Sequence, residues 1–304
     1  MSDELIRAGE KTWYTGGTSK TGFYLTDKRR VVIIDTGLGD PSGEGISEIL
    51  TARGWTPEAI FNTHSHADHI AGNAALQKKY GCPAYAMPVS AFFIRETRMN
   101  ATAIFGGLPT PEMEHPFFLA APSDCRVLTD SVMPHGMSFF SLPGHSYDMA
   151  GFACDDGTVF LSDALAEEKS LEVNPIAYMF DPGETFETLR NLAESRLPVT
   201  GAPLPGVRFV SSHCETRDRD GVAELAMMNI EHQKGVIELL KDLCREPVEQ
   251  DELVQRVFDH YGLRLTMNRF MLANGSVRNC MSWLHRRGEA KIDLSGNTFK
   301  WAVR

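Results

Sequence analysis

A short segment of the 304-residue sequence concentrates side chains that bind metal ions. His64, His66, Asp68 and His69 fall within six consecutive positions. Imidazole nitrogens and carboxylate oxygens together suit zinc, iron or manganese. We therefore interpret this segment as a metal-binding motif, and not as a polar loop whose histidines cap the helix that follows.

Three further residues of the same chemical kind stand at the ends of other apolar stretches. They are His145, Asp163 and His213. Each is a weak signal by itself, because a lone His or Asp at a strand end is usually a surface or capping residue. Together, however, four strand ends would offer ligands at one edge of a sheet, which is what a site for two metal ions requires.

Short strands and helices are predicted to alternate along the segments that position these residues. Continuous apolar runs bounded by turn residues predict strands, and apolar positions at helical spacing predict helices. Gly81 is the expected cap at the end of one helix. The predicted strands are 22–26, 30–34, 59–62, 138–142, 151–154, 158–161 and 207–211, and the predicted helices are 46–53, 70–80 and 183–195.

The order of these motifs resembles that of the metallo-β-lactamase fold hydrolases. The similarity extends over about 22–213. The matching motifs are HSHADH (64–69), PGH (143–145), SD (162–163), SH (212–213) and IIDTG (33–37). This resemblance implies an α/β fold of the αββα type, in which two sheets pack face to face, helices cover the outside and the metal ions lie at the sheet edges.

The resemblance also implies a role for each matching residue. Asp68 would bind a metal ion and also orient the nucleophile or accept its proton, in hydrolysis by a metal-bridging hydroxide. Asp35 would lie behind the ligands and orient a ligand loop. Two divalent ions are implied, with zinc expected first and iron or manganese also compatible. The first ion would be bound by His64, His66 and His145, and the second by Asp68, His69 and His213, with Asp163 between them.

The substrate is less clearly indicated. The family includes β-lactamases, glyoxalase II-like thioesterases, lactonases, nucleases, phosphodiesterases and sulfur dioxygenases. Asp163 argues against the most familiar β-lactamases, which lack that bridging residue, and a complete set for two ions argues against the single-iron dioxygenases. We expect a small ester, thioester or lactone, with Tyr178 or Tyr147 as a donor to the developing oxyanion.

A Phe- and Met-rich insertion at about 88–122 interrupts the strand pattern. The prolines at 109, 111, 116 and 122 and the pair Gly106-Gly107 predict an irregular helical segment. Long insertions of this kind often lie beside active sites. We expect its aromatic residues to form an apolar wall for an acyl group: Phe92, Phe93, Phe105, Phe117 and Phe118.

The chain changes character near residue 217. Helical stretches at 222–243, 253–261 and 276–285 precede a predicted hairpin at 291–303. This pattern resembles the winged-helix domain appended to one branch of the family, some of whose members act on RNA. We therefore divide the chain into a catalytic domain (1–216) and a helical, winged-helix-like appendage (217–304).

Charge is distributed unevenly between these parts. The formal net charge is −10, but 262–304 contains eight Lys or Arg and two Asp or Glu, so this end carries +6 and the rest −16. A basic winged helix could contact RNA or DNA, which makes a nuclease or phosphodiesterase the alternative function. The acidic body favours a small-molecule substrate, with an appendage that walls the site or forms a homodimer. A non-catalytic nucleic-acid-binding protein is the least favoured reading.

The sequence predicts a cytoplasmic protein. Its first ten residues are polar and acidic, unlike a secretory signal, and no apolar run reaches the roughly 18 residues of a membrane span. The six cysteines form no CxxC pair, so we expect free thiols in a reducing compartment. Cys214, beside His213, is expected to pack in the core and not to act as a ligand.

Overall fold

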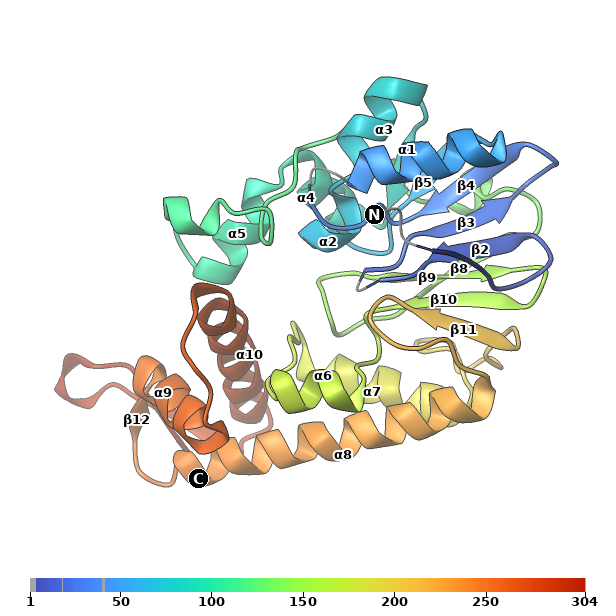
Figure 1. The fold of residues 1–304 in the computed structure, drawn as a ribbon. Helices are drawn as coiled ribbons and strands as arrows, with labels where there is room; N and C mark the ends of the chain where they lie inside the picture. Colours follow the sequence, from blue (N-terminus) through green and yellow to red (C-terminus); the bar gives the residue numbers. More distant parts are fainter. Residues whose placement is uncertain (1–3, 18, 40–41, 304) are drawn as a thin grey trace.

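Two β-sheets pack face to face in the computed structural model, which describes residues 4–17, 19–39 and 42–303 (Figure 1). The first sheet has seven strands in sequence order: β1 to β4 pair antiparallel, and β4 to β7 run parallel to one another. Its strands are β1 (Leu5–Arg7), β2 (Thr12–Thr15), β3 (Gly22–Leu25), β4 (Arg30–Ile34), β5 (Thr56–Phe61), β6 (Ala84–Ala86) and β7 (Arg126–Val127).

The second sheet has four strands in the order β11-β10-β9-β8. Its β10 and β11 are parallel, whereas the other pairs are antiparallel. Large side chains from both sheets fill the space between them, and the stacked rings of Phe61 and Phe152 have centroids 5.7 Å apart. The strands are β8 (Met137–Ser141), β9 (Ala150–Cys154), β10 (Thr158–Ser162) and β11 (Arg208–Ser211).

Helices cover the outer face of each sheet. On the first sheet, Leu50 of α1 and Leu76 of α3 join the hydrophobic cluster that includes Ile33 of β4. On the second sheet, α7 and the long α8 lie beneath the strands (Figure 1). The expected αββα sandwich is therefore confirmed. The bounds are α1 (Ser42–Arg53), α3 (Asn73–Tyr80), α7 (Pro182–Ala193) and α8 (Arg219–Leu243).

The helix predicted at 70–80 is divided in two. A single turn, α2 (Ala67–Ile70), is followed by a break and then by α3, whose end is capped by Gly81 in the left-handed conformation, as predicted. The break lies at Gly72, where a β-carbon would approach the carbonyl oxygen of Thr36 to 2.9 Å. Close packing against the loop after β4 thus stops the helix and lets the metal-binding motif form a separate turn.

The insertion is helical, as expected, and it packs against the C-terminal part of the chain. It contains α4 (Pro88–Arg95), α5 (Arg98–Phe105) and the short turn η1 (Pro111–Met113). Met113 and Phe118 form a small buried cluster with Met271 of α10. The insertion therefore bridges the first sheet to the C-terminal helices (Figure 1).

The C-terminal elements share their core with the second sheet. One hydrophobic cluster includes Leu161 of β10, Ile237 of α8, Met281 of α10 and Trp301 of β14. The hairpin predicted at 291–303 is present, and its turn is at 295–297. The boundary at 217 and the winged-helix likeness stay predictions. The elements are α9 (Gln250–Tyr261), α10 (Met267–Arg286), β12 (Val248–Glu249), β13 (Ala290–Asp293), η3 (Ser295–Asn297) and β14 (Lys300–Val303).

Two short elements follow other strands: η2 (Asp130–Val132) and α6 (Glu168–Val173). No helix in the described ranges combines the length and apolar character needed to cross a membrane.

Candidate metal centre

Four strand ends meet at one edge of the sandwich. The pairs β4–β5 and β10–β11 are parallel, so their carboxyl ends point the same way. Asp35 follows β4 and Ser162 ends β10, and both have left-handed backbone (φ 57° and 52°). Such a conformation is unfavourable for a residue with a side chain and recurs at functional sites. The left-handed backbone turns the chain sharply at both strand ends, which brings the predicted ligand residues together.

Three histidines form the first group of ligand atoms. The Nδ1 atom of His66 lies 2.9 Å from Nε2 of His64 and 3.0 Å from Nε2 of His145. All three nitrogens lie within 4.8 Å of one another. Three ring nitrogens that converge in this way are a typical ligand set for zinc or a similar ion.

Two carboxylates and two histidines form the second group: Asp68, His69, Asp163 and His213. Nε2 of His213 lies 3.2 Å from Oδ2 of both Asp68 and Asp163. Nε2 of His69 lies 3.3 Å from Oδ1 of Asp163. Asp163 also reaches Nε2 of His145 in the first group, at 3.5 Å, so its carboxylate lies between the two groups.

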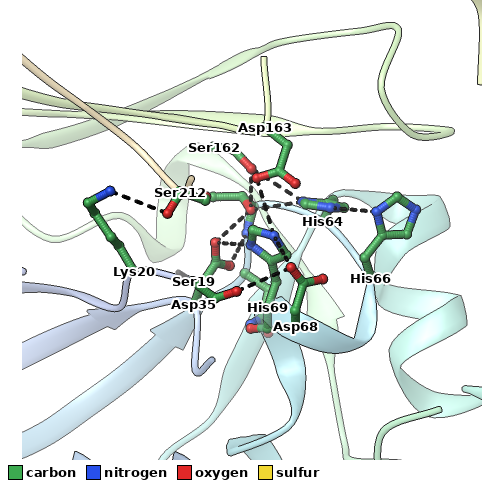
Figure 2. A network of polar contacts seen from close by, with 12 residues as sticks. Ser19, Lys20, Asp35, His64, His66, Asp68, His69, Ser162, Asp163 and Ser212 are labelled. Carbon is green, nitrogen blue, oxygen red and sulfur yellow. Dashed lines mark hydrogen bonds and ion pairs between the residues drawn. The ribbon is translucent and has the colours of Figure 1, made fainter. Parts of the chain in front are cut away.

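Asp35 ties the motif loop to a histidine of the second group (Figure 2). Its Oδ2 lies 2.8 Å from Nδ1 of His69, and its two oxygens accept hydrogen bonds of 2.7 Å from the backbone N–H and the hydroxyl of Thr63. A carboxylate at Nδ1 keeps the proton there and leaves Nε2 directed at the ligand cluster.

Hydroxyl groups hold the ring of His64 through its Nδ1 in a similar way. Its Nδ1 lies 3.1 Å from the hydroxyl oxygen of Thr63 and 3.3 Å from that of Ser162, and Ser162 donates to Thr63 at 2.8 Å. The bond between these two residues connects the motif loop to the end of β10. The orientation of the ring is thereby fixed from both sheets.

A buried amide pair holds the backbone of the motif loop. Asn73 donates to the side chain of Asn62 at 2.8 Å and accepts from the hydroxyl of Thr36 at the same distance. The amide of Asn62 in turn donates to the carbonyl of His69 at 3.1 Å. Because all these groups are buried and paired, the loop has few alternative conformations.

Two residues of the loop before β3 were missed by the sequence analysis (Figure 2). The hydroxyl of Ser19 donates to Asp68 at 3.3 Å. The ammonium of Lys20 donates to the carbonyls of Ser211, at 3.1 Å, and Cys214, which flank His213. A single Ser or Lys far from the motifs carries no sequence signal for this role, so only the fold reveals it.

Burial governs the histidines of the first group. It lowers the pKa of His66 to about 3, with the neighbouring His145 acting in the same direction. Burial also lowers the pKa of His64 and of His145. These rings are therefore neutral at physiological pH, the state in which imidazole binds a metal ion.

The second group is ionised. Asp163, together with Asp68, raises the pKa of His213 to about 10. Burial alone would lower the pKa of His69, but Asp163, Asp68 and Asp35 hold it well above its usual value. The two histidines in turn lower the pKa of both Asp68 and Asp163 against the effect of burial. Carboxylates that stay charged at such burial need a cation beside them.

The arrangement fits metal ions. Nε2 of His69 and Oδ1 of Asp163 face each other, yet neither makes a hydrogen bond within the described residues. Buried polar atoms without such a partner are rare in folded proteins. An ion bound between them would give both atoms a ligand bond in place of the missing hydrogen bond.

The two tyrosines differ in position. The ring of Tyr178 lies 5.4 Å from that of His66 and 5.8 Å from that of His145, centroid to centroid, and burial raises its pKa to about 12. Tyr147 stacks on Phe180 at 3.8 Å and is 46% exposed. Of the two, only Tyr178 lines the adjoining cavity.

A cavity of about 480 Å³ adjoins the metal-binding cluster. His145, Asp163 and His213 form part of its lining, while side chains of α8, α9 and α10 form another part. Its apolar residues include Leu165, Leu171, Ile176, Met179, Phe258, Leu263 and Leu272. The C-terminal segment is therefore part of the wall of the site.

The expected wall of five insertion phenylalanines is largely wrong. Among them, Phe117 alone lines the cavity. Phe93 and Phe118 are buried elsewhere, while Phe92 and Phe105 are 44% and 41% exposed. Met113 and Phe118 of the insertion pack against Met271 of α10 instead. The apolar lining comes mostly from the segment 164–179 after β10, with further residues from the C-terminal segment.

The cysteines are all buried and unpaired, as expected. Cys214 contacts the carbonyl of Leu165 through Sγ at 3.2 Å, and burial raises its pKa to about 12. A thiol held protonated in this way is a poor ligand, which agrees with a packing role.

A model of the Metallo-beta-lactamase superfamily matches residues 15–200. The chain belongs to this superfamily. The match covers more than half of the sequence and includes every proposed ligand except His213. Superfamily membership shows a hydrolase-type metal-binding fold and leaves the substrate open.

Curated relatives of the superfamily match over shorter segments. The chain is 40% identical over 73 residues to exodeoxyribonuclease WalJ of Streptococcus pneumoniae, which is 23% of this chain and 26% of that protein. It is 30% identical over 129 residues to a hydroxyacylglutathione hydrolase of Rhizobium johnstonii, 41% of this chain and 40% of that one. The chain thus spans less than half the length of each of these two relatives.

The whole chain has a counterpart among solved structures. A beta-lactamase domain protein from Burkholderia ambifaria superimposes with a TM-score of 0.72, covering 100% of this chain and 94% of the other at 15% identity. At that identity the likeness shows the fold alone. It extends through the C-terminal helices, so the superfamily sandwich and these helices form a shared architecture.

Proposed function

We propose that this protein is a hydrolase dependent on two metal ions that cleaves a small ester, thioester or lactone. One observation carries the proposal. Ligand residues His145, Asp163 and His213 belong to both the metal-binding cluster and the lining of a mostly apolar cavity. A reacting carbonyl and the organic group attached to it would therefore occupy adjoining spaces.

The two ligand groups would hold one ion each, with Asp163 between them. The first group is His64, His66 and His145, and the second is Asp68, His69 and His213. The bound ions would lower the pKa of water and polarise the scissile carbonyl. Zinc is the ion we propose, because three imidazoles and a carboxylate-rich neighbour suit it; iron or manganese would be revealed by metal analysis.

Asp68 is placed to orient the attacking nucleophile and accept its proton. One of its oxygens contacts Ser19 and His213, at 3.3 and 3.2 Å. Asp35 acts behind the ligands: it holds the ring of His69 and the backbone of Thr63 in place. Asp35 and the orienting part of the role of Asp68 concern positioning, which sets the geometry at which the reaction occurs.

Tyr178 is our candidate for stabilising the developing negative charge. Its ring lies beside His66 and His145 and lines the cavity. A phenol that stays protonated can donate a hydrogen bond to an oxyanion. Tyr147 is not in the lining, so we assign the role to Tyr178.

A substrate panel on metal-analysed protein tests the proposal. We expect about two equivalents of metal per chain and turnover of p-nitrophenyl esters, acyl thioesters or lactones, lost on chelation and restored by added zinc. Binding of only one equivalent would contradict the two-ion site. Absence of turnover across all three substrate classes with both ions bound would refute the proposed chemistry.

A nuclease or phosphodiesterase is the second candidate, and the match to exodeoxyribonuclease WalJ favours it. The excess of Lys and Arg in 262–304 points the same way. Against it, Arg269 is the single Lys or Arg among the cavity's lining residues, whereas a groove for a phosphate backbone is lined by several cations.

Salt dependence separates the two candidates. Nucleic acid held by a basic surface is released steeply as salt rises, because counterions are regained. We expect that this protein does not bind single-stranded DNA or RNA in this salt-sensitive way. Salt-sensitive binding together with phosphodiester cleavage, without acyl turnover, would establish the nuclease instead.

A further inference from the structure

Two buried amides lie one turn apart on α8, and both line the cavity. Asn229 is 4% exposed and Gln233 is 3% exposed. Residues four apart on a helix share one face, so the two side chains leave α8 on the same side. Their hydrogen bonding nevertheless differs completely.

Asn229 is fully engaged by protein. Its Oδ1 accepts from the backbone N–H of Ala166 at 3.0 Å, and its Nδ2 donates to the carbonyls of Ala166 and Leu225, both at 2.8 Å. It thereby fixes the loop between β10 and α6. Its position in the structure is explained without a ligand.

Gln233 has no such partners. Its Oε1 is buried and makes no hydrogen bond with any part of the chain that the structure describes. A buried amide oxygen left in this state is unfavourable, and native structures rarely contain one without a reason. In a cavity beside a catalytic centre, the simplest reason is a partner that enters with the substrate.

The charges around the cavity limit the kind of partner. Apart from the metal-binding residues, Arg269 is the only charged residue among the lining residues. Its guanidinium already faces the side chain of Asn174 and the carbonyls of Val173 and Arg264, at 3.2 to 3.5 Å. An ionised carboxylate or phosphate has no proton to donate to Oε1 of Gln233, and an ammonium group would meet no anion among the lining residues outside the metal-binding cluster, so the donor that suits Gln233 is uncharged.

We propose that Gln233 selects substrates whose acyl part carries an uncharged hydrogen-bonding group, a hydroxyl or an amide, separated from the scissile carbonyl by an apolar segment. This inference rests on the proposed acyl hydrolysis. The apolar segment would lie along residues such as Leu171 and Ile176, and the distal group would form a hydrogen bond with the side-chain amide of Gln233. Gln233 is thus a specificity-determining residue and takes no part in bond cleavage.

Matched substrates test this assignment. Thioesters of plain acyl chains and of the same chains with a terminal hydroxyl are compared over a series of lengths. A site built to bind a hydroxyl discriminates against the analogue that lacks it. We expect the wild type to prefer the hydroxyacyl member at one length by about tenfold or more in kcat/KM.

Gln233→Met keeps the side-chain length and removes both hydrogen-bonding groups. We expect it to abolish the preference through a higher KM for the hydroxyacyl thioester, with kcat and metal content retained. Lys234→Met, on the exposed side of α8 where Lys234 pairs with Glu231, should leave the preference unchanged. A preference that survives in Gln233→Met, or equal loss for both substrates, overturns the proposal.

Thioether analogues, in which the scissile carbonyl is replaced by CH₂, separate this inference from the proposed function. Their binding to metal-loaded protein is measured by calorimetry. The role of Gln233 is supported if the wild type, but not Gln233→Met, binds the hydroxyl-bearing thioether more tightly than the plain one. This holds even if no thioester is hydrolysed, and in that case only the proposed reaction fails. Equal binding of both thioethers by the wild type refutes the role of Gln233.

Discussion

The metal-binding cluster and the cavity wall on α8–α10 differ in how their polar groups are hydrogen-bonded. In the cluster, rings and carboxylates are held by further side chains: Asp35 behind His69, Thr63 and Ser162 behind His64. In the wall, the lining is mostly apolar, and the buried Oε1 of Gln233 has no hydrogen-bond partner among the residues that the structure describes. The cluster is organised before a substrate arrives, whereas the wall has a polar group left to be satisfied.

This difference assigns separate tasks to the two regions. A preorganised set of ligands serves the chemical step, because bond-breaking groups must be held within fractions of an ångström. A mostly apolar cavity lined by the buried amide of Gln233 serves recognition, because an unmet hydrogen bond penalises the wrong ligand. Substitutions in the cluster should therefore reduce kcat and metal content, and substitutions in the wall should change KM and stability.

His66→Ala should have the largest effect. His66 supplies the nitrogen that lies nearest both His64 and His145, so its loss opens the first ion site. We expect metal content to fall to one equivalent or less and kcat/KM to drop by about a thousandfold or more, corresponding to roughly 4 kcal/mol of lost transition-state stabilisation. Metal analysis and acyl hydrolysis measure this. His135→Ala, at an exposed histidine outside the cluster, is the control.

Tyr178→Phe should lower kcat by about 100- to 1000-fold, as loss of an oxyanion donor does, with metal content and KM little changed. Tyr147→Phe, which removes the hydroxyl from the tyrosine outside the lining, should leave kcat unaffected. Steady-state kinetics on the best ester or thioester decides between them. A loss confined to Tyr147→Phe would reverse the assignment.

Asp35→Asn should weaken binding of the second ion by about 10- to 100-fold. The amide cannot accept from His69 and Thr63 with both of its heavy atoms, so the His69 ring loses its fixed orientation. Competition with a chromophoric chelator measures the affinity, and Asp124→Asn, on the surface, is the matched control. Unchanged affinity in Asp35→Asn would show that the carboxylate has no role in holding the ligand.

The smallest effects should come from two substitutions in the cavity wall, which should change the free energy of unfolding in opposite directions. Gln233→Met removes an unpaired buried amide and should raise the free energy of unfolding by about 1 kcal/mol. Asn229→Leu leaves the N–H and carbonyl of Ala166 without their partners and should lower it by about 1–3 kcal/mol. Thermal and urea unfolding of the two variants measure this. Destabilisation by both would mean that Gln233 is as engaged in the protein as Asn229.

The ligand residues at the ends of strands were the part of the site that the sequence could predict. The cluster at 64–69 is dense enough to be read locally, and His145, Asp163 and His213 each follow a strand with an evident apolar run. Because parallel strands end at the same edge, finding the strands was sufficient to bring these residues together. Asp35 was expected from the resemblance to the family, through the IIDTG motif, and the structure has it directly after β4.

The cavity wall could not be predicted in this way. Its residues come from α6, α8, α9 and α10, whose apolar positions look like any core-facing helix. The aromatic insertion appeared to be the better candidate, but its α5 contacts α10 and its α4 packs against the first sheet. Nor could the break at Gly72 be predicted from helical spacing, because it arises from a contact with Thr36 that is distant in sequence.

The hydrophobic cluster that joins β10, α8, α10 and β14 has a consequence for how the chain opens. Elements that share a core exchange their amide hydrogens in one cooperative event, not as independent parts. Protection on the C-terminal hairpin should therefore follow that of the second sheet, and occupation of the cavity should slow exchange in both together. Residues that contact the substrate and residues near the chain's last strand would thus respond as one folding unit.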